Sequence, residues 1–210
     1  MILNNRTTIP EGLVRRVLLA AAHDAGLRNT SELVVRVASG RGGGKAHGCH
    51  LVLAKLAGVK SRKNPHYIDC NGYVEMLWPH LGWPKHPCKG PQETAEYIYK
   101  LSVHEFTHIR DFRKGGLAWS HRVYPFSRRP KHDERPEEMR ANMQAAWVMA
   151  NLTEGRKALI NELAAACCPN HVRPENPGCT CGYDQMQDVT SALRTGFLNL
   201  ANIMEITDDC

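Results

Sequence analysis

The sequence predicts an α+β protein, with a small sheet in the first half of the chain and helices in the second half. Short β-branched or apolar segments separated by Gly, Asn and Pro lie before residue 80, a pattern typical of short strands. Two later segments, 93–114 and 136–152, carry apolar residues at helical spacing. With 210 residues, 42% of them hydrophobic, the chain can bury a sizeable core. We expect one domain over residues 1–160 and a smaller extension over 161–210.

An amphipathic helix is predicted over residues 10–27. Its apolar stretch follows two arginines and loosely resembles a signal peptide, but Glu11 precedes the arginines and His23 and Asp24 end the run. No apolar run in the chain approaches the length of a membrane span. We therefore expect a cytoplasmic protein that has no membrane partner.

The strands are expected between this helix and residue 80. The candidates are residues 32–37, 50–53, 67–69 and, as a strand or a helical turn, 73–77. The glycine-rich stretch 39–48 does not match a phosphate-binding loop, because Ser39 takes the place of the first Gly and Ala46 that of Ser/Thr. Its glycine content favours a flexible hairpin or loop tip. Residues 78–87 form a Pro-broken connector, whose tryptophans we expect to pack on the core.

Residues 93–114 have the clearest helix signals and carry the most informative motif of the chain. Acidic residues cluster at the start, basic residues lie near the end, and a Gly-Gly pair follows. His104, Glu105 and His108 form the pattern H-E-x-x-H. Histidines four residues apart share a face of a helix and can bind one zinc ion, with the Glu beside the metal as general base. The motif therefore predicts a catalytic zinc site.

A catalytic zinc site needs a third protein ligand and an open position for water. The second helix supplies a candidate, and we expect Asp133 to cap its N-terminus. Glu138 is then the one acidic side chain on the inward stripe, above two alanines that allow close packing against the first helix. Glu137 is expected to point about 100° away.

The H-E-x-x-H helix followed by a helix with E-x-x-A resembles the gluzincin metallopeptidases, over about residues 93–152. The small size and the Arg-Pro-Glu-Glu entry to the second helix resemble minigluzincin-type or SprT-like members, including phage-borne ones. The resemblance implies a zincin-like fold and hydrolysis of peptide bonds. It implies His104, His108 and Glu138 as ligands of a catalytic Zn²⁺ and Glu105 as the base. In such enzymes an extended peptide lies along an exposed sheet edge beside the metal; the sequence does not identify that strand.

Several residues near the motif have more than one predicted role. His121, Tyr124 and His132 lie between the two helices and are candidates to stabilise an oxyanion. His121 or His132 as a fourth metal ligand would instead favour a non-catalytic zinc-containing module that binds protein or nucleic acid. The presence of Glu105 argues against that alternative, because a structural zinc site does not need it. Asp111 is expected to be an outer carboxylate or a surface charge rather than a ligand.

A second metal site is possible in the C-terminal extension. The chain has 8 Cys, and in a reducing cytosol clustered cysteines bind metal more often than they form disulfides. The candidate ligands of a structural zinc ion are Cys168, His171, Cys179 and Cys181, with Cys167 as an alternative to either Cys168 or His171. The alternative is a loop with exposed thiols.

The net charge is +6 at pH 7, and the segment between the two predicted ligand helices is rich in Arg and Lys. A basic rim beside the metal would attract acidic peptides, or nucleic acid that carries a protein substrate. The alternative is a solvated loop whose charges are partly paired. A peptide or protein substrate is the expected partner, with nucleic acid as a further candidate.

Overall fold

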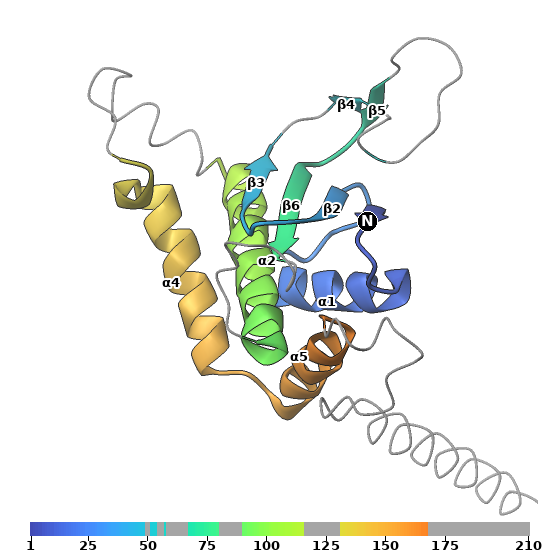
Figure 1. Cartoon of the computed structure of the whole chain (residues 1–210). Helices are drawn as coiled ribbons and strands as arrows, with labels where there is room; N and C mark the ends of the chain where they lie inside the picture. Colours follow the sequence, from blue (N-terminus) through green and yellow to red (C-terminus); the bar gives the residue numbers. More distant parts are fainter. Residues whose placement is uncertain (49–50, 54–56, 58–66, 80–89, 116–130, 168–210) are drawn as a thin grey trace, which may run out of the picture. The chain divides into compact units, whose positions relative to one another are not determined.

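The computed structural model describes residues 1–48, 51–53, 57, 67–79, 90–115 and 131–167, all within one compact unit, Met1–Pro169 (Figure 1). The α+β class is confirmed. The strands are β1 (Ile2–Arg6), β2 (Val34–Gly40), β3 (Gly44–His47), β4 (Leu51–Leu53), β5 (Tyr67–Asp69) and β6 (Tyr73–Pro79). The helices are α1 (Glu11–Asp24), α2 (Pro91–Arg113), α4 (Pro136–Ala150) and α5 (Glu154–Cys167), with a 3₁₀ turn η2 (His132–Glu134) before α4. In these ranges no helix combines the length and the apolarity needed to cross a bilayer.

The main sheet is mixed, with the strand order β1-β2-β6-β3. The first three strands in this order are parallel, and β3 runs antiparallel to β6. Because parallel neighbours need a crossover, α1 joins β1 to β2. β4 and β5 form a separate antiparallel pair. Within the described part of the chain β3 is an edge strand, since only β6 pairs with it.

Most of the predicted strands are confirmed, and residues 73–77 belong to a strand rather than a helical turn. The sequence did not predict β1, because only Ile2 and Leu3 are apolar there and three polar residues follow. Its pairing with β2, from Ile2 opposite Val34 onward, stabilises this otherwise weak strand. The glycine-rich stretch also contains a strand, β3, which its low β-propensity concealed.

The core lies between one face of the main sheet and helices α1 and α2 (Figure 1). Alternate residues of β2 and β6 point into it, and α5 covers the helices with Ile160 and Leu163. The sheet contributes Val35, Val37, Val74, Met76 and Trp78. Trp78 is buried, as expected for a tryptophan of the 78–87 segment; the rest of that segment lies outside the described residues.

Helices α1, α2 and α4 follow the predictions closely, apart from the start of α4, whereas α5 was not predicted as an element. Asp133 does not cap α4: it lies in η2, and Arg135 occupies the N-cap position without a side-chain hydrogen bond. Pro136 at the first helical position already lacks an N–H group, which reduces the need for a cap. Glu137 is buried like Glu138, so Glu138 is not the one acidic side chain on the inward side. Helix α4 contacts both α2 and η2. The predicted extension, 161–210, begins inside α5, and most of it lies outside the described residues.

Candidate metal centre

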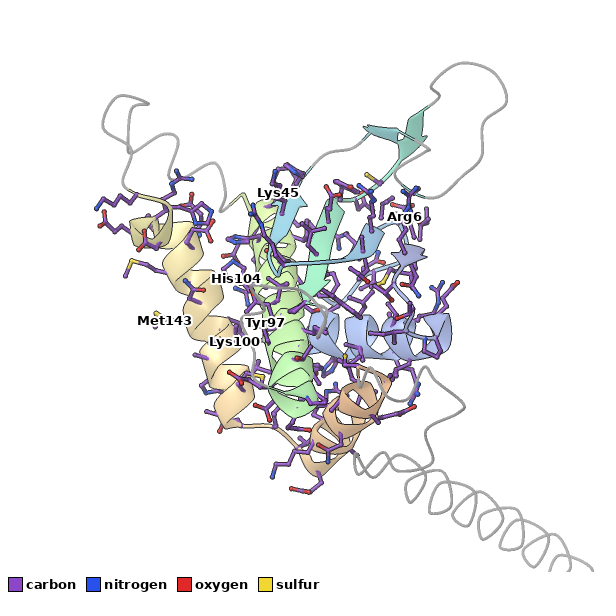
Figure 2. The ribbon with its side chains drawn as sticks, viewed as in Figure 1. Arg6, Lys45, Tyr97, Lys100, His104 and Met143 are labelled. Atoms are coloured by element: carbon purple, nitrogen blue, oxygen red, sulfur yellow. The ribbon has the colours of Figure 1, made fainter. Side chains whose placement is uncertain are left out.

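Two helices carry the predicted ligands. His104 and His108 lie one turn apart on α2, and α4 packs alongside α2 with Glu138 in its first turn. Figure 2 shows His104 on the side of α2 that faces α4. The small buried residues Ala141 and Ala145 allow this close approach, as the sequence predicts. All three ligand candidates are largely withdrawn from solvent.

The ligand atoms of these residues converge on one point. The Nε2 atoms of His104 and His108 are 3.0 Å apart, and each lies 3.3 Å from Oε2 of Glu138. In a tetrahedral zinc site with zinc–ligand distances of about 2.0–2.1 Å, the ligand atoms are about 3.3 Å apart. Two imidazole nitrogens and one carboxylate oxygen are a donor set that suits zinc. Among the described residues these three form the one group able to hold a metal ion.

The predicted base lies beside this group and is packed tightly. Glu105 is 4% exposed, and a Cβ atom on Gly44 of β3 would lie only 2.6 Å from its carboxyl carbon. Only glycine therefore allows β3 to pass this close to the carboxylate. The need for a glycine at residue 44 was not visible in the sequence, because the glycine-rich stretch gave no sign of what it would contact.

Burial and neighbouring charges shift the pKa values of Glu105 and Glu138 in opposite directions. The pKa of Glu105 is raised from 4.5 to about 7, because the effect of burial outweighs the opposing effect of His104, and nearby Glu138 adds to the increase. Burial would also raise the pKa of Glu138, but hydrogen bonds with His104 and His108 and the charge of His132 lower it well below its usual range. Glu138 is thus ionised, as a metal ligand must be. The pKa of Glu105 lies near neutral pH, which suits a general base.

His132 contacts the third ligand candidate rather than joining the group. Its Nε2 atom lies 3.1 Å from Oε1 of Glu138, the oxygen that does not face the two histidines. The two oxygens of the Glu138 carboxylate thus face different partners, Oε1 facing His132 and Oε2 facing His104 and His108. The other predicted residues of the loop and of the cysteine cluster lie outside the described residues: His121, Tyr124, Cys168, His171, Cys179 and Cys181.

The edge strand β3 presents backbone groups beside Glu105. Leu77 donates its N–H to the carbonyl of Gly43, and these two residues lie opposite each other. This shows which residues of β3 form hydrogen bonds with β6 in the antiparallel pair. Because such pairs alternate, Lys45 and His47 direct their backbone groups to β6, while Gly44 and Ala46 direct theirs outward. Among the described strands, β3 is thus the sheet edge that lies next to Glu105.

Comparison with protein-family models, with curated proteins and with solved structures finds no match for this chain.

Proposed function

We propose that this protein is a zinc-dependent metallopeptidase of gluzincin type with a zincin-like fold. One observation carries the proposal: two imidazole nitrogens and a carboxylate oxygen converge at the spacing of tetrahedral zinc ligands, with a buried carboxylate beside them. His104, His108 and Glu138 would hold the ion. When bound, zinc lowers the pKa of a water molecule and polarises a carbonyl group.

Glu105 acts on that water. It would accept a proton from the water and pass it to the nitrogen atom that leaves when the peptide bond breaks. The geometry that Gly44 permits keeps this carboxylate close to β3. A side chain held in place in this way is ready for proton transfer without a costly rearrangement.

The substrate is an extended peptide that adds to the edge of the main sheet. The outward N–H and C=O groups of Gly44 and Ala46 can pair with a peptide backbone, as in other β-augmentation complexes. This arrangement holds a peptide by its main chain next to Glu105. It favours peptides over non-peptide amides as the substrate class.

The alternative of a non-catalytic zinc module has less support. It requires a protein side chain in the position of the water; His132 contacts Glu138 instead of entering the ligand group, and the other candidate, His121, lies outside the described residues. A buried, ionisable Glu105 would also have no use in a purely structural site.

Glu105→Gln tests the function, with Glu96→Gln on the exposed side of α2 as the matched control. Zinc content and cleavage of a quenched fluorescent peptide library of mixed sequence are measured on each purified protein. We expect both variants to keep the zinc of the wild type, and cleavage by Glu105→Gln to fall by about 10²–10⁴. Full cleavage by Glu105→Gln would refute the mechanism. Zinc binding without any cleavage by the wild type would favour the binding module.

A further inference from the structure

Asp111 lies one turn beyond His108 on α2, buried between two arginines. It is 7% exposed, and Arg110 donates to its Oδ1 at 2.9 Å while Arg140 of α4 donates to its Oδ2 at 3.1 Å. Arg110 also donates to the backbone carbonyl of Ala25, just after α1, at 2.9 Å. Both carboxylate oxygens of Asp111 are thus engaged. We call Arg110, Asp111 and Arg140 the interhelix tether.

The tether joins the two ligand helices close to the ligands themselves. Asp111 is three residues from His108, and Arg140 is two residues from Glu138. Near the ligand end of α4 the buried apolar residues are Ala141 and Ala145, whose small side chains allow close approach but interlock little, while the larger Val148 lies further along the helix. Such packing fixes the distance between two helices, but it does little to prevent one helix from sliding along the other. A directional ion pair can fix that register.

Metal binding is sensitive to this register. Zinc–ligand distances in proteins vary by only about 0.2 Å, so a small slide of α4 along α2 would move Glu138 Oε2 out of range of a metal held by the histidines. Further along α4, Gln144 donates to the backbone carbonyl of Asp24, a full turn beyond Arg140. The tether thus joins α4 to α2 within one turn of Glu138.

We propose that the tether is a positioning device, which sets the metal affinity by holding Glu138 in register with His104 and His108. This inference rests on the proposed metal site and assigns a role to residues that do not touch the metal. Removal of an outer partner of a metal site commonly weakens metal binding by about 10- to 100-fold.

The experiment measures zinc dissociation constants by competition with a chromophoric chelator, and thermal midpoints of the metal-free proteins. The variants are Arg140→Gln, Asp111→Asn, the double variant and Arg140→Lys. The control is Arg156→Gln, which breaks a different ion pair, between α5 and Asp24. Arg140 is 45% exposed in its side chain, so Arg140→Gln should fold even if Asp111→Asn does not.

We expect Arg140→Gln and Asp111→Asn each to weaken zinc binding by about tenfold or more. The double variant should bind zinc no more weakly than the more affected single variant, because the two substitutions remove the same ion pair. Arg140→Lys should recover part of the affinity, and Arg156→Gln should lower the thermal midpoint without changing zinc affinity. Wild-type zinc affinity in Arg140→Gln would overturn the inference while leaving the metal site intact. A wild type that binds no zinc at His104, His108 and Glu138 would overturn the metal site and the inference together.

Discussion

Two partly buried polar clusters contact α2, and they balance their charges in different ways. In the first, called here the Asp24 cluster, the carboxylate of Asp24 accepts hydrogen bonds from the hydroxyl of Tyr99 at 2.6 Å and from the guanidinium of Arg156 at 2.9 and 3.0 Å. Burial would raise the pKa of Asp24, but these partners lower it. In the second, the metal centre, two ring nitrogens and a carboxylate oxygen converge within 3.3 Å.

The difference lies in how the negative charge is balanced. The Asp24 cluster carries its own cation, Arg156, and joins α1, α2 and α5 without help from a ligand. The metal centre brings together electron-pair donors and a buried Glu105 whose raised pKa shows that its ionised form is disfavoured there. A bound dication would favour that ionised form. One cluster is therefore complete for folding, and the other has a donor set that could hold a cation.

The largest expected effect separates the two clusters by their dependence on zinc. Asp24→Ala leaves the buried hydroxyl of Tyr99 and the guanidinium of Arg156 without their acceptor, and should lower the free energy of unfolding by about 3–4 kcal/mol. The loss should be the same with zinc and with excess EDTA. Urea unfolding under both conditions measures it, and Asp24→Asn, which keeps one acceptor oxygen, should lose less. A loss confined to the zinc-loaded protein would show that the two clusters are coupled.

A somewhat smaller effect concerns Glu105 and pH. Its folded-state pKa of about 7 is above the ordinary 4.5, so between pH 4.5 and 7 the folded state binds more protons than the unfolded state. This group's contribution to stability is therefore present below pH 4.5 and is lost as the pH rises to 7. In metal-free protein, Glu105→Gln should be more stable than the wild type at pH 8, by up to about 3 kcal/mol, and equally stable near pH 4.5.

Urea unfolding in EDTA at the two pH values provides the measurement. Glu96→Gln, an exposed change on the same helix, should show no such pH dependence. If Glu105→Gln were no more stable than the wild type at pH 8, burial of Glu105 would not disfavour its charge. The contrast with Asp24, where loss of the carboxylate destabilises the fold, would then disappear.

The smallest of these effects concerns Gly44. An added Cβ atom would lie 2.4–2.7 Å from three atoms of Glu105, so Gly44→Ala must displace the carboxylate or β3. A displacement of about 1 Å can reduce catalysis by about 100-fold, which corresponds to about 2.7 kcal/mol. Peptide cleavage at saturating zinc measures this loss. Gly90→Ala is the control, because a Cβ atom there meets nothing within 4 Å. Wild-type activity in Gly44→Ala would show that Glu105 does not need its observed position.

The sequence predicted the parts of this molecule that depend on local periodicity. His104 and His108 share a face because of helical spacing, and the second helix was found from Pro136 and the apolar stripe that follows. What it could not predict depends on contacts between distant segments. β1 needs β2 as a partner, Gly44 matters because Glu105 lies against it, and Asp111 meets Arg140 across 29 residues of chain. Asp133 was wrongly expected to cap α4 because the cap signal is short and fits the 3₁₀ turn equally well.

The most direct test of the metal centre is the zinc content per chain, measured by elemental analysis on the wild type and on His104→Ala/Glu138→Ala. Cys179→Ser/Cys181→Ser accounts for zinc bound by the predicted cysteine cluster, and His23→Ala/Glu96→Ala is a matched control that removes one exposed His and one exposed Glu elsewhere. We predict that His104→Ala/Glu138→Ala holds one zinc ion fewer than the wild type, and that the matched control holds the same amount. Unchanged zinc in His104→Ala/Glu138→Ala would contradict the proposal that these side chains form a metal site.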